Sequence, residues 1–452
     1  AGNDVLFGIG GDDRIDGGLG NDTMAGGFGN DVYVVDSLGD TIIEILQAGG
    51  LFEGDGVDTV ETAISYALVL GVENLTLTGT ANINGTGTAA DNVITGNAGN
   101  NVLDGGFGND TLLGGAGNDT YFVNAEGDTV SDTSGFDVVF SSSLIHTLGA
   151  GVEDGTLTDG GYALQGNTLA NVLEGNDADN NIIGGAGNDT INGRDGTDFL
   201  AGGIGSDAVD GGAGGDYLVG GAGNDIVSGG LGDDSLDSLG GLVEAAGADQ
   251  MSGGLGNDSY FVENPGDVVT ELPGQGRDFV YANISYTLTA NVEELFFGGA
   301  ANLNGTGNAL ANRLFGNSGI NTLNGLAGAD HMEGGEGNDI YIVDNAADFI
   351  AESAGVDIDL VQASVSYRIP FNVERLTLTG VGNINGTGNN QANIIIGNSG
   401  DNILDGRGSG DSLQGGLGND TYIVDHPGDV VVDTGGSADL VKSSVNFTMG
   451  TG

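Results

Sequence analysis

The sequence predicts an all-β protein, a parallel β-roll or β-helix solenoid in which repetitive arrays are joined by strand-rich flanking modules. The clearest indication is the run 184–237, which forms six consecutive turns of nine residues without a slip in register. Glycine holds the first and fourth places of every turn, where the backbone needs a positive φ and a close approach. Each turn continues into a short strand with one inward apolar side chain, and two turns make one stacked coil.

The eighth and sixth places of this run are as constant as the glycines. The eighth place is always aliphatic, in Ile191, Leu200, Val209, Leu218, Val227 and Leu236. The sixth place is always Asp, so every turn carries a carboxylate at a fixed offset from inward-pointing carbonyl groups. Hard oxygen donors without sulfur or imidazole suit Ca²⁺, which takes about 6–8 oxygens at about 2.3–2.6 Å. The sequence therefore predicts calcium ions along the turns.

The sixth-place Asp recurs in four other arrays, and we expect all of these residues to bind calcium. They are Asp4, Asp13, Asp22, Asp31, Asp110, Asp119, Asp189, Asp198, Asp207, Asp216, Asp225, Asp234, Asp249, Asp258, Asp330, Asp339, Asp411 and Asp420. The alternative, a solvated acidic turn, is favoured less in the six-turn run than in the arrays with only two such residues.

This nonapeptide pattern resembles the RTX, or hemolysin-type calcium-binding, family. The resemblance implies that each ion is shared between turns on the same edge of the roll and that backbone carbonyls complete its shell. It also implies multiple Ca²⁺ ions, on the order of ten to twenty, and export of the unfolded chain through a type I secretion channel.

The ending Gly-Asn-Asp-x-Tyr closes each of five arrays and sets the predicted organisation. The arrays are 1–36 with a truncated start, 96–124, 175–263 with an insertion at 238–243, 316–344 and 397–425. The flanking β modules are 37–95, 125–174, 264–315, 345–396 and the truncated 426–452. Because the sequence opens and stops in mid-repeat, we expect a segment of a larger protein.

The flanking modules are repeats of their own kind. Each has a Gly-Asp pair or its variant close to its start, and 72–79 and 373–380 read Val-Glu-x-Leu-Thr-Leu-Thr-Gly. Alternating Leu and Thr predicts half-buried strands, and the following Asn and Gly residues predict turns. We expect the flanks to continue the solenoid with hydrogen-bonded Asn/Thr turns in place of ions. Independent small β domains are the alternative.

Two further regularities concern the ends of the arrays. The eighth place of the last turn is Tyr in every array: Tyr33, Tyr121, Tyr260, Tyr341 and Tyr422. We expect these rings to pack inward, with carbohydrate stacking as the alternative. In the first turn of arrays two to five the sixth place is Asn, in Asn101, Asn180, Asn321 and Asn402. We expect no ion, or a weakly held one, at these turns.

Composition limits the partners. The chain has 65 acidic and eight basic side chains, which give a formal charge of −57. Because these charges repel one another, compaction requires bound cations. Nucleic acid and anionic lipid are excluded as partners by this charge. No apolar run approaches the ~20 residues of a membrane span. The lack of cysteine leaves metal ions, and no disulfides, to stabilise the chain.

The sequence offers no catalytic residues and predicts no enzyme activity. Its three histidines, His146, His331 and His426, lie in separate modules and are expected at the surface. The zinc-protease His-Glu-x-x-His and the Gly-x-Ser-x-Gly nucleophile elbow are both missing.

We therefore expect a non-catalytic, calcium-dependent structural segment of a large secreted protein, located outside the cell or on its surface. A surface layer, a filament or an adhesin stalk would use such a segment, and other copies of the chain are the expected partners. The alternatives are the RTX tail of a secreted hydrolase or polysaccharide-modifying enzyme, and a module that binds cell-surface polysaccharide.

Overall fold

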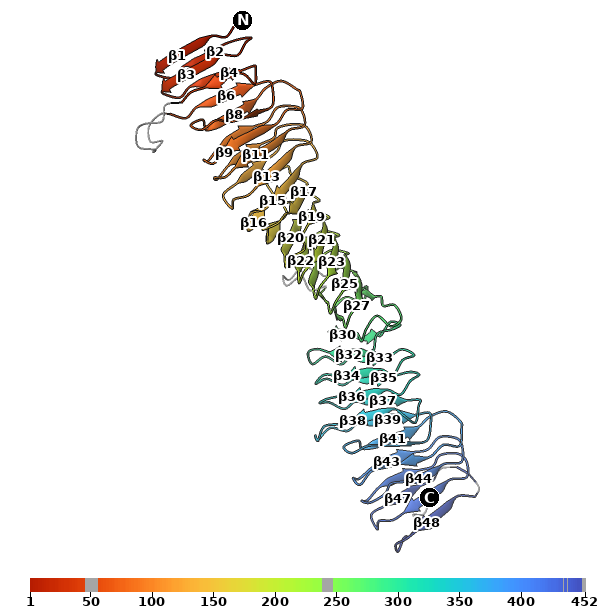
Figure 1. Cartoon of the computed structure of the whole chain (residues 1–452). Helices are drawn as coiled ribbons and strands as arrows, with labels where there is room; N and C mark the ends of the chain where they lie inside the picture. Colours follow the sequence, from red (N-terminus) through yellow and green to blue (C-terminus); the bar gives the residue numbers. More distant parts are fainter. Residues whose placement is uncertain (45–55, 238–246, 434, 437, 449–452) are drawn as a thin grey trace. The chain divides into compact units, whose positions relative to one another are not determined.

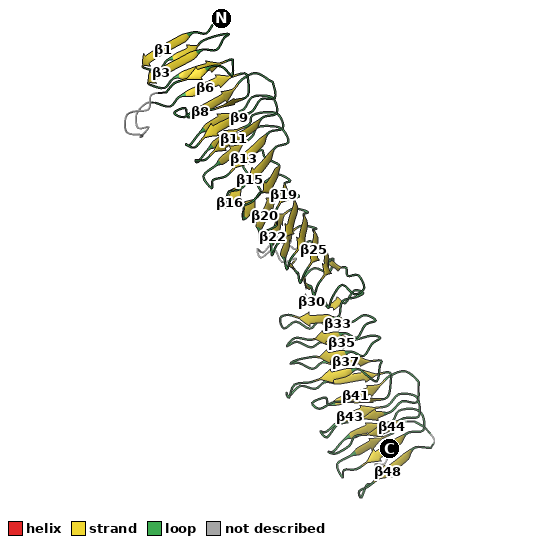
Figure 2. Cartoon of the chain, in the orientation of Figure 1, coloured by secondary structure: helices red, strands yellow, loops and turns green. Residues whose placement is uncertain are grey.

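The computed structural model describes residues 1–44, 56–237, 247–433, 435–436 and 438–448 (Figure 1). The predicted insertion at 238–243 lies outside them. The chain divides into two compact units, Ala1–Gly230 with Gly240–Ala245, and Leu231–Leu239 with Ala246–Gly452. The described residues are all strands, turns and loops (Figure 2), and they contain no helix suited to crossing a membrane.

The first unit is built from twenty-five short strands, the last of which ends at its boundary. They are β1 (Val5–Gly10), β2 (Arg14–Asp16), β3 (Thr23–Phe28), β4 (Val32–Val35), β5 (Thr41–Ile42), β6 (Thr59–Thr62), β7 (Tyr66–Ala67), β8 (Asn74–Leu77), β9 (Gly85–Thr88), β10 (Val93–Thr95), β11 (Val102–Gly106), β12 (Thr111–Leu113), β13 (Thr120–Val123), β14 (Thr129–Ser131), β15 (Val138–Ser141), β16 (Ile145–Thr147), β17 (Asp154–Leu157), β18 (Ala163–Gln165), β19 (Val172–Glu174), β20 (Asn181–Ala186), β21 (Thr190–Asp195), β22 (Phe199–Ile204), β23 (Ala208–Ala213), β24 (Tyr217–Ala222) and β25 (Ile226–Leu231) among the described residues.

The second unit repeats the same construction. Its described strands are β26 (Ser235–Asp237), β27 (Gln250–Leu255), β28 (Ser259–Val262), β29 (Val268–Val269), β30 (Phe279–Ala282), β31 (Tyr286–Thr287), β32 (Glu294–Phe297), β33 (Asn304–Thr306), β34 (Arg313–Phe315), β35 (Thr322–Asn324), β36 (His331–Glu333), β37 (Ile340–Val343), β38 (Phe349–Ala351), β39 (Leu360–Ala363), β40 (Tyr367–Arg368), β41 (Arg375–Leu378), β42 (Gly386–Thr387), β43 (Ile394–Ile396), β44 (Ile403–Asp405), β45 (Ser412–Gln414), β46 (Thr421–Val424), β47 (Val430–Val432) and β48 (Leu440–Ser443).

Within each unit, a strand pairs in parallel with the strand two places further along the chain. In the first unit β2, β4, β6 and β8 are neighbours in one sheet, and in the second unit β35, β37, β39 and β41 are neighbours in another. Consecutive strands therefore lie in different sheets, and one coil contains two of them. Figure 1 shows the strands of each unit stacked in succession. The predicted parallel β-solenoid is confirmed.

The core of the solenoid is a column of eighth-place side chains. Leu200 of β22 is in register with Ile182 on one side and with Leu218 on the other, and all three are completely buried. Since the strand alternates inward and outward residues, each strand contributes one such residue to the column. Burial of each aliphatic side chain contributes about 1.5–3 kcal/mol.

The flanking modules continue these ladders instead of forming separate domains. Tyr33 of the first array is in register with Val60 of β6, which in turn faces Leu75 of β8. In the second unit Tyr341 of β37 faces Val361 of β39 in the same way. On this side of the coil the apolar column thus runs from array to flank, whereas the ladder on the other side stops at β5 and a new sheet begins at β7.

Two side-chain expectations can be compared with the structure. The array-end tyrosines are at most 1 % exposed, so they pack inward, and a role in stacking on carbohydrate does not fit. The expected surface position of His146 is wrong, because this side chain in β16 is only 3 % exposed. The equivalent place in three other flanks holds a tyrosine, in Tyr66, Tyr286 and Tyr367.

Candidate metal sites

The sixth-place residues form hydrogen-bonded columns along the turns. In the long array, the backbone N–H of Asp189 donates to Oδ1 of Asp207 at 2.7 Å, one coil or eighteen residues further on. The N–H of Asp198 donates to Oδ1 of Asp216 at 2.9 Å in the parallel column. One oxygen of each carboxylate is therefore committed to the neighbouring backbone. This contact holds the carboxylate in a fixed orientation at the turn.

The second carboxylate oxygen points into a buried space. Within the described residues, Oδ2 is buried without a hydrogen-bond partner in Asp13, Asp22, Asp31, Asp110, Asp119, Asp189, Asp198, Asp207, Asp258, Asp330, Asp339, Asp411 and Asp420. Of the predicted ligands, only Asp4 is exposed and only Asp13 is half-buried; the others are buried. A buried carboxylate oxygen with no partner is costly, so this arrangement calls for a cation.

The first-place glycine provides room for that cation. A methyl group added to Gly184 would lie 2.5 Å from both Asp189 Oδ2 and the carbonyl oxygen of Gly202. At Gly202 the same position lies 2.5 Å from Asp207 Oδ2 and from the carbonyl oxygen of Gly220. Each cradle is thus bounded by a carboxylate oxygen of one coil and a backbone oxygen of the next. These hard oxygen donors fit Ca²⁺.

Electrostatics leads to the same conclusion. Burial, together with the neighbouring carboxylates, raises the pKa of Asp198 and of Asp207 to about 6, although the backbone N–H donor opposes the shift. Carboxylates on adjacent coils are separated by about one strand spacing, ~4.8 Å. Two unit charges at that distance repel by about 3–4 kcal/mol at an effective dielectric constant of about 20. A divalent ion in the cradle converts this repulsion into attraction.

The structure extends both columns beyond the predicted ligands. Oδ1 of Asp40, in the Gly-Asp pair after the first array, accepts the N–H of Asp22 at 2.9 Å. Its Oδ2 accepts the N–H groups of Asp36 and Ser37, both at 3.2 Å. The Gly-Asp pair therefore closes one column with a carboxylate whose two oxygens are both satisfied. The sequence shows this pair in every flank, but the pair was interpreted only as a boundary marker.

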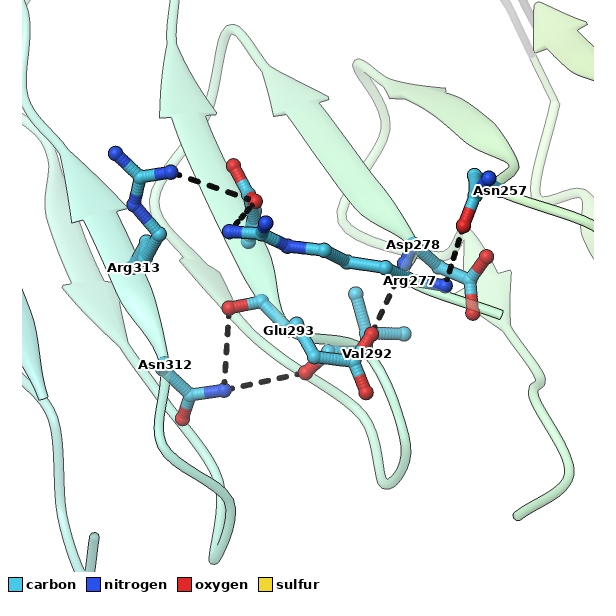
Figure 3. Close-up of polar contacts among 8 residues, drawn as sticks. Asn257, Arg277, Asp278, Val292, Glu293, Asn312 and Arg313 are labelled. Atoms are coloured by element: carbon cyan, nitrogen blue, oxygen red, sulfur yellow. Dashed lines mark hydrogen bonds and ion pairs between the residues drawn. The ribbon is translucent and has the colours of Figure 1, made fainter. Parts of the chain in front are cut away.

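The other column ends on a glutamate. In the second unit, the N–H of Asp258 donates to Oδ1 of Asp278, and the N–H of Asp278 donates to Oε2 of Glu293, both at 2.9 Å. Figure 3 shows Asp278 and Glu293 in this arrangement. The glutamate of the Val-Glu pair, which recurs in the flanks of this chain, thus takes the place of the next sixth-place Asp. Sequence reasoning missed this role because the spacing departs from nine.

The first turns of the arrays are arranged differently. Oδ1 of Asn180 accepts the N–H of Asn176 at 2.8 Å, and its Nδ2 donates to Oδ1 of Asn176 at 3.1 Å. The N–H of Asn180 joins the column through Oδ1 of Asp198 at 2.7 Å. Both polar atoms of the amide are occupied within the chain. An ion-free or weakly occupied turn at Asn180 remains our prediction.

A comparison with known protein families identifies the same repeats. The family model described as the RTX calcium-binding nonapeptide repeat (4 copies) matches 1–33, 86–121, 165–200, 174–209, 210–241, 245–260, 306–341 and 387–422. Together these matches cover just over half of the chain.

Two bacterial relatives from Rhizobium meliloti (strain 1021) match shorter stretches. The chain is 39% identical over 89 residues to the endo-1,3-1,4-beta-glycanase ExsH, which is 18% of this chain and 19% of that protein. It is 33% identical over 106 residues to the endo-1,3-1,4-beta-glycanase EglC, which is 23% of each. The chain thus spans about a fifth of the length of these relatives.

Proposed function

Because this chain belongs to the RTX calcium-binding nonapeptide-repeat family and so binds several calcium ions, we propose that it is a calcium-dependent structural segment of a larger secreted protein. In this proposal the sixth-place Asp residues are the ligands, and the five arrays and their flanks fold as one kind of solenoid. The buried, partnerless Oδ2 atoms of residues such as Asp189 and Asp207 carry the proposal. They make the fold dependent on an added cation.

The cellular setting follows from where calcium is plentiful. RTX repeats are typical of proteins secreted by type I systems. Extracellular calcium modules bind with affinities of about 10⁻⁴–10⁻³ M, so the chain would remain unfolded inside the cell and fold outside. A solenoid segment that folds only with extracellular calcium suits a surface layer, a filament or an adhesin stalk.

Calcium titration tests the proposal directly. Circular dichroism of the full chain in a chelator should show an unfolded spectrum, and calcium should bring in the strand signal cooperatively. Calorimetry on the same samples would give the number of ions bound. A strand spectrum that persists in excess chelator at pH 7 would contradict the proposal.

Self-association is the proposed mode of assembly. Strands at the end of a solenoid leave unpaired backbone groups that another copy can cover, and head-to-tail contacts that do not close give filaments. Sedimentation of the calcium-loaded chain over a range of concentrations should show growing assemblies. A monomer at the highest concentration would count against a filament or a surface layer.

A second candidate is the RTX tail of a secreted polysaccharide hydrolase. The observation in its favour is the similarity to two proteins named endo-1,3-1,4-beta-glycanases. In either setting we propose that the chain itself is not catalytic. Incubating the folded chain with mixed-linkage β-glucan and measuring released reducing ends should give no activity above a boiled control.

A third candidate, polysaccharide binding, has one specific feature in its favour. In the second unit the rings of Phe296 and Phe315 stack with centroids 4.5 Å apart, and Phe279 meets Phe296 edge-on at 5.7 Å. The guanidinium of Arg313 lies 5.1 Å from the centroid of the Phe315 ring, and Arg277 lines a surface pocket with Phe279 and Phe296. Both arginines, labelled in Figure 3, pair with Glu294. Aromatic rings beside polar groups suit sugar rings. Retention of the wild type, but not of a Phe296→Ala variant, on immobilised polysaccharide would support this candidate.

A further inference from the structure

Each array ends in a cluster of three acids that the nonapeptide pattern does not contain. Among the described residues the clusters are Asp31, Glu44 and Asp58; Asp119, Asp132 and Asp137; Asp258, Glu271 and Asp278; Asp339, Glu352 and Asp359; and Asp420, Asp433 and Asp439. In every case the first acid is the sixth-place Asp of the last turn and the other two belong to the flank. The three ligand oxygens lie within 4.8 Å of one another. We call these the array-end clusters.

The cluster after the second array is completely enclosed. Oδ1 of Asp119 accepts the N–H of Asn101, and Oδ1 of Asp137 accepts the N–H of Asp119, both at 2.7 Å. Oδ2 of each is buried with no hydrogen-bond partner, and Asp137 is 0 % exposed. Asp132 brings its Oδ2 to the same place, where it accepts the hydroxyl of Tyr121 at 2.6 Å. Three carboxylate oxygens therefore converge on one space, two of them without a partner.

The cluster after the third array shows the same arrangement with Glu in the middle position. Glu271 is 5 % exposed, and its Oε2 has no hydrogen-bond partner. Its Oε1 accepts the hydroxyl of Tyr260, which in turn accepts the N–H of Gly253 at 2.5 Å. Asp258 adds a second buried oxygen without a partner. A glutamate buried in this way requires a partner that the chain does not supply.

The tyrosine fixes the middle acid. The hydroxyls of Tyr33, Tyr121, Tyr260 and Tyr341 each donate to the acid eleven residues further on. The separation between the second and third acids, in contrast, varies from cluster to cluster. A constant spacing on one side of a variable loop indicates that the tyrosine and the middle acid act together.

The space between the acids has the dimensions of a cation site. A methyl group added to Gly114 would meet the Tyr121 hydroxyl, Asp119 Oδ2 and Asp132 Oδ2, so the glycine opens a space lined by these oxygens. Two ligands on opposite sides of a calcium ion are about 4.6–5.2 Å apart. The oxygens of each cluster lie within 4.8 Å of one another, so one ion can contact all three. Burial also raises the pKa of Asp137 and of Asp278 to about 7, as expected where an uncompensated charge is enclosed.

We propose that each array-end cluster is a calcium site of its own kind, with one carboxylate from the array and two from the flank. This inference rests on the proposed calcium-dependent fold. Three carboxylates give the site more charge than the nonapeptide cradles, so it binds calcium more tightly. The tyrosine is a positioning residue that holds the middle acid. Binding ties the end of the array to the flank that follows it.

A substitution in the full chain tests the site. Glu271→Gln keeps an oxygen for the Tyr260 hydroxyl but removes the charge, whereas Glu336→Gln makes the same change at an exposed position of the same unit. Equilibrium dialysis at low free calcium should show one tightly bound ion fewer in Glu271→Gln than in the wild type and no loss in the control. Circular dichroism at saturating calcium checks that both variants fold.

Terbium luminescence provides a second measurement that does not depend on counting ions. The chain has no tryptophan, so tyrosine is the principal sensitiser of bound Tb³⁺. Tyr260→Phe, whose ring adjoins a cluster, should remove part of the sensitised emission. Tyr217→Phe, a partly exposed ring next to the nonapeptide ligand Asp216, should remove less.

The outcomes separate this inference from the proposed function. If the wild type does not fold on adding calcium, the proposed function fails. If it folds, but Glu271→Gln binds as many tight ions as the wild type, only the array-end site fails.

Discussion

At the scale of single residues, the sixth-place carboxylates decide when the chain folds. Each places one oxygen on a neighbouring N–H and the other in a cradle, as in Asp207. The burial that makes this oxygen available to a cation also makes the ionised form unfavourable without one. Acidity and calcium should therefore act on the same atoms.

We expect the ion-free chain to fold at acidic pH. Burial raises the pKa of Asp198 and Asp207 to about 6, above the ordinary value of about 3.9. The folded state therefore holds more protons than the unfolded chain between these values. The stability this supplies is fully present below about pH 4 and is lost as the pH rises through about 6. Circular dichroism in chelator, followed from pH 7 to pH 4, should show the strand signal increase.

Calcium affinity should have the opposite pH dependence. Protons compete with the ion for the same oxygens, so the calcium concentration that half-saturates the folded chain should rise as the pH falls below about 6. A half-saturating concentration, measured by equilibrium dialysis, that does not change between pH 7 and pH 5 would show that the buried carboxylates are not the ligands.

One turn provides a matched pair of substitutions. Asp198 is buried in the sixth place, and Asp195 is exposed in the third place of the same turn. Asp198→Asn keeps the oxygen that accepts the N–H of Asn180 but replaces the charged ligand. We expect it to raise the calcium midpoint about tenfold, or about 1.4 kcal/mol, and Asp195→Asn to leave it within about twofold. Equal effects would show that only overall charge matters.

At the scale of elements, the short strands depend on the apolar column between the sheets. Leu200 in β22 is completely buried between Ile182 and Leu218. A strand of six residues or fewer has little stability of its own, so this packing and the parallel ladder hold it in place.

Truncation of Leu200 should therefore destabilise the calcium-loaded fold. Leu200→Ala should cost about 2–5 kcal/mol, whereas Ile204→Ala, at a residue 59 % exposed on the same strand, should cost about 0.5 kcal/mol or less. Denaturant unfolding followed by circular dichroism in excess calcium measures both. Similar costs would mean that the column contributes little.

The sequence predicted the elements better than it predicted their junctions. The nine-residue period was sufficient to place Leu200 inward, because one period governs both glycine turns and apolar places. The period could not predict that Glu271 and Asp278 lie beside Asp258. No single period connects these three residues, and only the closure of a coil brings them together. The constant spacing from Tyr260 to Glu271 was the available signal. For His146 the available signal was the tyrosine that other flanks carry at the same place, in Tyr66, Tyr286 and Tyr367.

At the scale of the whole molecule, the formal charge of −57 makes the fold conditional on its ions. Exposed carboxylates are screened by ordinary salt, but buried ones are screened much less. Overall screening should therefore not replace a cation held inside the turns.

We expect neither sodium nor magnesium to substitute for calcium. In chelator, raising NaCl to about 1 M, where the Debye length is about 3 Å, should leave the chain unfolded. Magnesium prefers octahedral sites at about 2.0–2.1 Å and gives up its water reluctantly, so it should fail at concentrations where calcium succeeds. Circular dichroism with each salt makes the comparison, and folding in NaCl alone would show that repulsion at the surface is the main barrier.

The hydrogen bonds that join residues eighteen apart have a consequence for growth. A coil contacts only the coil before it and the coil after it. If the long array gained or lost whole coils, each remaining residue would still meet an equivalent neighbour. Gene duplication in steps of eighteen codons would lengthen the array without requiring any new kind of contact, and each coil that has folded would serve as the template for the next.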